Sequence, residues 1–116
     1  MKKTIATLML IGALSISGPA FAAASCFGTI SQVKTEDDGA VLIYSSWRTA
    51  YTQVCNLKDN WKGIDPQTCW GWFAHSSTAL TENLAVRVYY AALASGDCPT
   101  LDTGSLSPAP TYIILH

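Results

Sequence analysis

Four cysteines are the residues of this chain with the clearest capacity for chemistry. Cysteines hold zinc, act as nucleophiles or form disulfides, depending on their spacing and on the cellular compartment. No Cys-x-x-Cys pair is present, and only His75 and His116 could complete a zinc site. The pattern therefore favours disulfides over a metal site. The four residues are Cys26, Cys55, Cys69 and Cys98, and they permit three pairings.

The other polar residues form no recognisable catalytic motif. His75 precedes Ser76, but no Gly-x-Ser-x-Gly segment surrounds a serine nucleophile. Asp37 and Asp38 are adjacent carboxylates in an acidic turn, without the further oxygen ligands that Ca²⁺ requires. We therefore expect a protein that is not an enzyme and that holds neither a metal nor a cofactor, with a hydrolase as the alternative.

Aromatic residues are dense for a chain of this length, with four tryptophans and five tyrosines. Such rings stack on sugars and are enriched at protein interfaces, but they also fill cores. Trp47 and Trp61 fall in expected turns or loops, where an exposed large apolar ring often marks an interaction site. Core filling is the alternative for all of them, and most of all for Trp72 and Tyr90. The candidate binding residues are Trp47, Trp61, Arg87, Tyr89 and Tyr90.

The first 22 residues have the order of a secretory signal peptide. Lys2 and Lys3 form a basic head, residues 5–16 are largely apolar, and an Ala-Phe-Ala sequence ends at Ala22. The apolar stretch is shorter than the about 20 residues that span a bilayer, so we expect no membrane span. Cleavage after Ala22 leaves residues 23–116 as one small domain, in the periplasm or secreted by a Gram-negative type of export. That oxidising location supports the disulfides.

The exported part is acidic. It carries five basic and eight acidic residues, which gives a net charge of −3. Proteins that bind nucleic acid usually present a surplus of positive charge to the phosphates. Nucleic acid is therefore not an expected partner.

Alternating apolar residues predict an antiparallel meander in the first half of the domain. Residues 26–35 read as the first strand, and apolar residues of opposite parity within it indicate a bulge. An Asp-Gly pair in the turn of residues 36–39 is a strong hairpin signal. Residues 40–47 and 51–57 supply the second and third strands.

A helix is predicted after the meander. Asp65 can cap its first N–H groups, and Pro66 suits the first helical position. Asn83 is the expected end, and residues 85–90 and 112–115 then read as two strands separated by a loop rich in Gly, Ser and Pro. The apolar stripe of the helix joins Cys69, Phe73, Ser76, Leu80 and Leu84.

This order predicts a mainly β domain with one helix, namely an OB-fold-like five-stranded Greek-key barrel with the helix between its third and fourth strands. A ubiquitin-like or cystatin-like arrangement is the alternative, although those folds place the helix earlier. Cys69 lies on the core stripe of the helix, 14 residues after Cys55 of the third strand. We therefore predict a Cys55–Cys69 disulfide and, by remainder, a Cys26–Cys98 disulfide.

Two resemblances follow from these segments. The helix from Asp65 that passes through Asn83 into Val-Arg-Val-Tyr-Tyr resembles the helix and next strand of the B subunits of AB5 toxins of the subtilase-cytotoxin and pertussis-like type. Residues 30–33 and the Val-Cys end of the third strand resemble other strands of those subunits. Through Trp47-Arg48, residues 54–57 and the Pro-rich tail, the chain resembles more closely the small, disulfide-linked, uncharacterised exported OB-fold-like proteins of proteobacteria.

The toxin resemblance implies an OB fold, a ring-shaped homopentamer with helices lining a central pore, and recognition of sialylated or related glycans. It places Tyr90 at a tyrosine near the sugar site, and Cys26 where those subunits have a serine. We expect an exported binding module that recognises a glycan or a protein partner. The alternative is a periplasmic structural or accessory protein without a ligand site.

Overall fold

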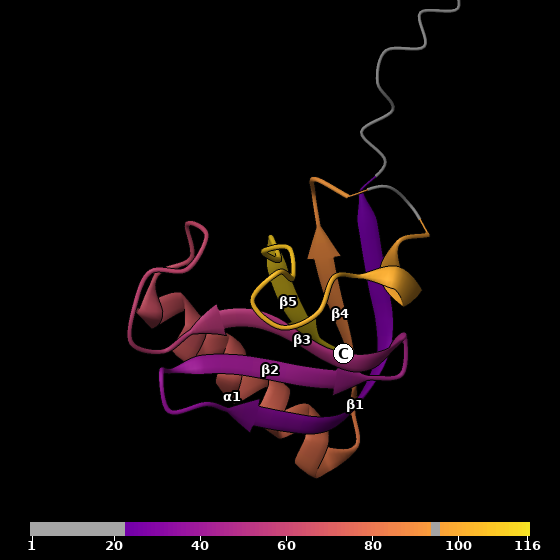
Figure 1. The fold of residues 1–116 in the computed structure, drawn as a ribbon. Coiled ribbons are helices and arrows are strands. Elements are labelled where there is room, and N and C mark those ends of the chain that lie inside the picture. The colour runs from indigo at the N-terminus through magenta and orange to yellow at the C-terminus, as the bar shows by residue number, and fades with distance from the viewer. Residues whose placement is uncertain (1–22, 94–95) are drawn as a thin grey trace, which may run out of the picture.

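Five strands and one α-helix make up the part of the chain that the structure describes. The computed structural model describes residues 23–93 and 96–116. The predicted signal peptide, residues 1–22, lies outside the described residues. The elements in chain order are β1 (Ala24–Thr35), β2 (Ala40–Ser45), β3 (Arg48–Asn56), α1 (Pro66–Glu82), β4 (Ala85–Tyr90), the 3₁₀ helix η1 (Cys98–Thr100) and β5 (Tyr112–Leu115) (Figure 1). The predicted fold class, mainly β with one helix, is confirmed.

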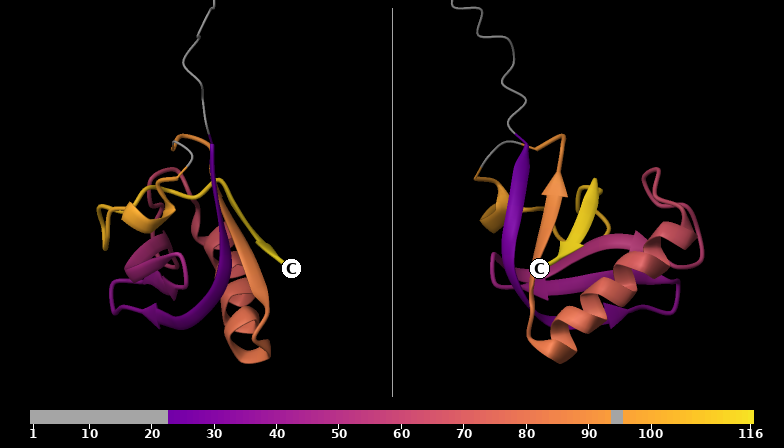
Figure 2. Two further views of the ribbon diagram at one scale, coloured as in Figure 1. Left: turned by 90° about the vertical axis from the view of Figure 1, so that its right-hand side faces the viewer. Right: turned by 180° about the vertical axis from the view of Figure 1, so that it is seen from behind.

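The strands form one antiparallel sheet in the order β3-β2-β1-β4-β5. β1 belongs to both halves of this sheet, because its first half pairs with β4 and its second half with β2. A register shift between Ile30 and Gln32, at the start of the half that pairs with β2, confirms the predicted bulge. β1 curves strongly along its length, so that the two halves of the sheet face different directions (Figure 2).

α1 begins and ends at the residues that the sequence predicts. The Asp65 carboxylate accepts a hydrogen bond of 2.8 Å from the Thr68 N–H, and Pro66 lies in the first turn. Hydrogen bonds with the Thr68 side chain and backbone lower the pKa of the Asp65 carboxyl. Asn83 adopts a left-handed conformation, with φ at 53°, and ends the helix. No helix among the described residues is long and apolar enough to cross a membrane.

The buried face of α1 differs from the predicted stripe. The side chains of Cys69, Trp72, Ser76 and Ala79 are buried, whereas Leu80 is 39% exposed. The prediction that Leu80 lies on the core stripe is wrong. Two neighbouring faces of this helix carry apolar residues, and turning the Trp72 indole inward buries more apolar surface than a leucine does.

Both predicted disulfides are present. Cys55 of β3 bonds to Cys69 of α1, and Cys26 of β1 bonds to Cys98 of η1, with Cα–Cα distances of 5.4 and 5.6 Å. The first bridge ties the helix to the meander, and the second ties the loop between β4 and β5 to β1. Cys26, Cys55 and Cys69 belong to the core, in which Val41, Ile43, Val54, Val86 and Val88 are fully buried.

The loop between β4 and β5 covers the free side of β3. The Arg48 Nε donates to the Leu101 carbonyl at 2.9 Å, and the Gly104 N–H donates to the Tyr51 carbonyl at 3.2 Å. The Ser107 hydroxyl accepts a hydrogen bond from the Gln53 N–H at 3.0 Å. These bonds hold an irregular segment against a regular edge, which satisfies backbone groups that would otherwise be unpaired.

Candidate recognition surface

The outward side of β1, β4 and β5 gathers aromatic side chains around one arginine. Residues alternate along each strand, so the inward side carries the buried valines and the outward side carries their neighbours. The pairing register aligns Ser25 with Tyr89 and Tyr89 with Tyr112, and the next row aligns Phe27 with Arg87 and Arg87 with Ile114. We call this surface the aromatic face, and it consists of Ser25, Phe27, Arg87, Tyr89, Tyr112 and Ile114.

Arg87 lies at the centre of the aromatic face. Its Nη1 donates to the Ser25 hydroxyl at 2.7 Å, and its guanidinium carbon lies 5.1 Å from the centroid of the Phe27 ring. Within residues 23–93 and 96–116, no carboxylate forms a salt bridge with it. The guanidinium is thus held in position by a hydroxyl and a ring.

The apolar side chains around Arg87 are partly open to solvent, and two of them stack. Tyr89 and Tyr112 stack with their ring centroids 4.8 Å apart and 19° between their planes. Phe27 is 51% exposed, Ile114 is 42% exposed and Tyr112 is 36% exposed. Exposed apolar groups are thus concentrated on one side of this small sheet, which makes this side the candidate interaction surface.

The predicted binding residues lie in different parts of the structure. Arg87 and Tyr89 lie together on the aromatic face, but Tyr90 is only 1% exposed and points into the core. Burial raises the pKa of the Tyr90 phenol. Trp47 and Trp61 lie elsewhere, partly buried against the core, and the Lys62 ammonium lies 4.8 Å from the centroid of the Trp61 ring. Tyr90 therefore fills the core.

Sequence reasoning missed four members of the aromatic face, namely Ser25, Phe27, Tyr112 and Ile114. The alternation within β1 and β5 carried the signal, because it separates Phe27 from Cys26 and Ile114 from Ile113. It did not reveal that these strands flank β4.

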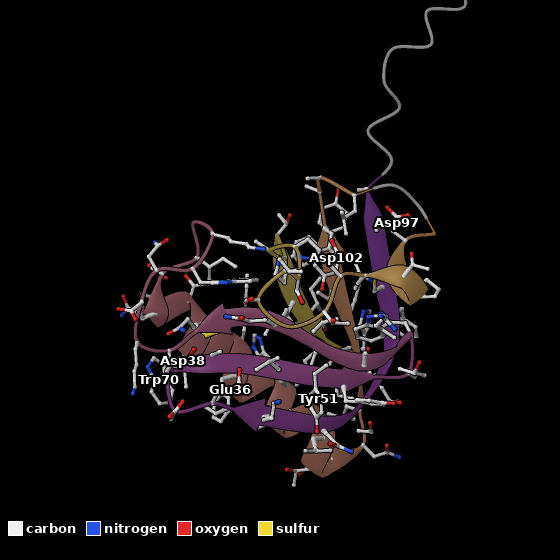
Figure 3. All side chains as sticks on the ribbon, viewed as in Figure 1. Glu36, Asp38, Tyr51, Trp70, Asp97 and Asp102 are labelled. Atoms are coloured by element: carbon white, nitrogen blue, oxygen red, sulfur yellow. A yellow bond between two sulfur atoms is a disulfide. The ribbon has the colours of Figure 1, made fainter. Side chains whose placement is uncertain are left out.

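Acidic side chains are dispersed over the molecule. Figure 3 shows Glu36 and Asp38 at the turn between β1 and β2, away from Asp97 and Asp102 in the loop before β5. The Asp38 carboxylate accepts a hydrogen bond of 3.0 Å from the Ala40 N–H, which gives it a role in the turn. Among the described residues, no group of three His, Cys, Asp or Glu side chains could hold a metal ion.

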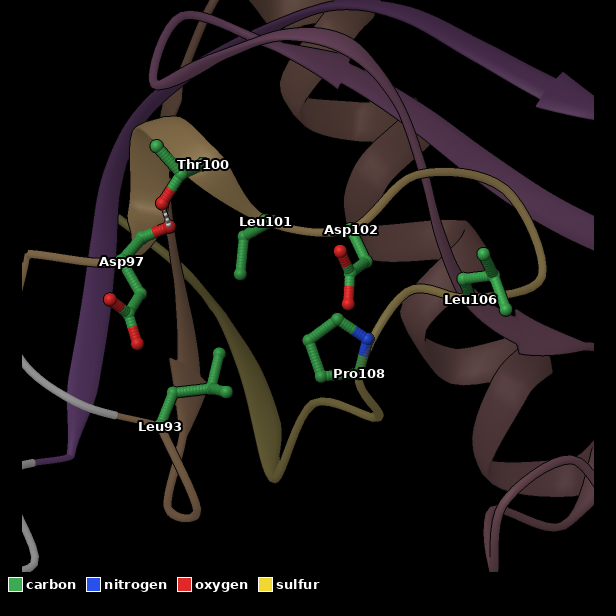
Figure 4. A pocket seen from close by; sticks show the side chains of 7 residues that line it. All are labelled: Leu93, Asp97, Thr100, Leu101, Asp102, Leu106 and Pro108. Atoms are coloured by element: carbon green, nitrogen blue, oxygen red, sulfur yellow. Dashed lines mark hydrogen bonds between the residues drawn. The ribbon is translucent and has the colours of Figure 1, made fainter.

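Two open hollows lie beside the loop between β4 and β5. The first, of about 300 Å³, has Leu93, Leu101 and Pro108 along it with the carboxylates of Asp97 and Asp102 (Figure 4). The second, of about 370 Å³, lies at the start of α1, where Trp72 and Thr68 approach the residues before β5. Neither hollow contains any of the predicted binding residues.

The chain was compared with protein-family models, with curated proteins and with solved structures. None of the three comparisons finds a match.

Proposed function

We propose that this protein is an exported binding module that recognises a glycan through the aromatic face. The observation that carries the proposal is the Arg87 guanidinium, which forms no salt bridge with a described carboxylate and lies over the exposed Phe27 ring, one row away from the Tyr89–Tyr112 stack. Sugars present apolar C–H faces to aromatic rings and hydroxyl groups to polar side chains. A guanidinium adds a paired, charge-assisted contact with a carboxylate. These groups together suit an acidic sugar such as a sialylated glycan.

We further propose that the fold is OB-fold-like. Three features support this assignment: the β1-β2-β3 meander, the helix between β3 and β4, and a first strand that pairs with both β2 and β4. A loop segment that includes Gly104 pairs with β3 at the side where β5 would close such a barrel. The proposed barrel is therefore open between β3 and β5.

Export is part of the proposal. The two disulfides support it, because such bonds persist in oxidising compartments. Expression of the full chain in a Gram-negative host tests this directly. We expect the protein in the periplasmic fraction or the medium, with Ala23 as its first residue by intact-mass measurement. A cytoplasmic protein that retains Met1 contradicts export.

Binding is tested by titrating the purified protein with sialyllactose and, separately, with lactose. We expect Arg87→Ala to weaken sialyllactose binding about tenfold or more, because a hydrogen bond to a charged group contributes about 1.5 to 3 kcal/mol. Lactose, which lacks the carboxylate, should bind more weakly than sialyllactose to the unaltered protein.

Lys34→Ala is the matched control. Lys34 also lies over a ring, 4.4 Å from the centroid of Tyr51, but Glu36 lies 3.9 Å from its ammonium group. We expect this variant to bind sialyllactose like the unaltered protein. Equal losses in Arg87→Ala and Lys34→Ala would contradict a role for the aromatic face. Absence of any sugar binding would support the accessory-protein alternative.

A further inference from the structure

The two edges of the sheet differ in how their backbone groups are paired. At the β3 edge, the loop segment supplies partners through Gly104, which bridges to Thr52, and through Ser107. At the other edge, β5 pairs with β4 and with no other described strand. Seen from behind, β4 lies directly beside β5 (Figure 2). The β3 edge is thus covered by the loop segment, and we call the β5 edge, with which no described strand pairs, the open edge.

The register identifies the open backbone groups. The His116 N–H donates to the Ala85 carbonyl at 2.9 Å, in line with the β4–β5 pairing. Alternate residues of an antiparallel strand direct their backbone groups to opposite sides. Tyr112 and Ile114 therefore direct theirs toward β4, and Ile113 and Leu115 direct theirs toward the open edge.

β5 lacks most of the features that normally protect an edge strand. Proteins block such edges with short strand length, charged side chains, prolines, bulges or covering segments, and of these β5 has only a short length of four residues. The sequence of β5 is Tyr-Ile-Ile-Leu, and its pairing with β4 has no register shift. This neutral strand would not repel an identical strand.

We propose that β5 pairs antiparallel with β5 of a second copy of this chain, across a two-fold axis. Antiparallel pairing of identical strands is self-complementary, so one edge per copy is enough. A closed ring of copies joined by their sheet edges would instead need β5 of one copy to pair with a different edge strand of the next copy. The loop segment occupies β3, which is the other edge of the described sheet, so the two-fold pair is the arrangement that the edges allow.

The pairing has a consequence for the aromatic face. A two-fold axis perpendicular to the joined sheet keeps both aromatic faces on the same side. Tyr112 and Ile114 of both copies then meet at the centre of a six-stranded surface that has one Arg87 on each flank. This arrangement rests on the proposed function for its ligand. It predicts that the dimer binds glycans with two acidic ends more tightly than glycans with one acidic end.

The pairing itself is tested without a ligand. We expect light scattering coupled to gel filtration, at micromolar concentration, to give twice the mass of the single exported chain. Ile114→Lys should give the single-chain mass, because it places like charges next to each other across the two-fold axis. Leu80→Lys, at a similarly exposed site on α1, should stay at the double mass.

Hydrogen exchange locates the contact. In the unaltered protein, the amides of Ile113 and Leu115 should exchange slowly, and in Ile114→Lys they should exchange quickly while the amide of Val88 stays protected. That last amide shows that the fold is intact. A monomer, a pentamer, or a dimer with fast exchange at both edge amides overturns the proposal. Because none of these measurements involves a sugar, their failure is separate from failure of the glycan proposal.

Discussion

Gly28 of β1 faces Ser46 of the β2–β3 turn so closely that a Cβ atom at Gly28 would lie 2.0 Å from the Ser46 Oγ. The Ser46 hydroxyl accepts a hydrogen bond from the Thr29 N–H at 3.1 Å, and the Ser46 N–H donates to the Thr29 carbonyl at 2.9 Å. The turn is thus bound to the middle of β1. Since β1 carries one side of the aromatic face, this contact helps to hold that face in position.

Gly28→Ala should destabilise the protein by about 1 to 3 kcal/mol, because the new methyl group displaces Ser46 and then meets the Trp47 ring. Chemical denaturation measures the loss. Gly71→Ala is the control, since a Cβ there meets nothing within 4 Å and alanine favours a helix. A smaller loss in the Gly28→Ala, Ser46→Ala double variant would confirm the cause. Equal stability of the two single variants would contradict the contact.

Asp65→Ala should lower the melting temperature by a few degrees at neutral pH, because it removes the cap of α1. The pKa of Asp65 is lower in the folded protein than in the unfolded chain, so its contribution is present above the unfolded value and is lost as the pH falls through the folded value. The difference in melting temperature between the two proteins should therefore shrink in acid. Asp65→Asn, which keeps a capping oxygen, should stay close to the unaltered protein at neutral pH. A difference that grows in acid would show that the carboxylate is not the cause.

Trp72 and Trp70 form a matched pair on α1, with 8% and 56% of their surfaces exposed. Trp72→Ala should destabilise the protein by about 3 to 5 kcal/mol, since it leaves a cavity in the core. Trp70→Ala removes an edge-to-face contact with Phe73 and should cost less than about 1 kcal/mol. Urea titrations of both variants compare the two losses, and the reverse ranking would mean that the other face of the helix is buried.

Removal of either disulfide should destabilise the protein by about 2 to 5 kcal/mol. The two bridges span 72 and 14 residues. In the chain-entropy account, the double variant Cys26→Ala, Cys98→Ala should lose about 1.5 kcal/mol more stability than the double variant Cys55→Ala, Cys69→Ala. Thermal unfolding compares them, and peptide mapping of the unreduced protein verifies the remaining bridge. A larger loss at the shorter bridge would mean that native packing around Cys55, and not loop entropy, dominates.

Local signals made much of the fold predictable. Asp65, Pro66 and Asn83 delimit the helix because caps act on backbone groups within a few residues of themselves. The Asp-Gly turn and the alternation within the strands are equally local signals, so the meander could also be predicted. The Cys55–Cys69 pairing was predictable because both residues lie in elements that had been identified.

The candidate surface was less predictable. Arg87 and Tyr89 were recognised as an outward pair on one strand, but their neighbours come from β1 and β5, at opposite ends of the chain. The alternation of apolar and polar residues predicts which residues share a side of a strand, but it does not predict which strands are neighbours. Leu80 shows the same limit on a helix, where two adjacent apolar faces competed for one core.

By itself, the sequence determined the kind and order of the five strands and the α-helix, the ends of that helix and the Cys55–Cys69 pairing, from which Cys26–Cys98 followed by remainder. Capping, turn chemistry and alternation made this possible, because they depend on residues that are close together in the chain. Only the tertiary structure decided that Tyr90 is buried, that Phe27 and Tyr112 flank Arg87 and Tyr89, and that the loop covers β3 while β5 stays open. Those outcomes depend on strand register and on competition for the core, and both are set by contacts between residues far apart in the sequence.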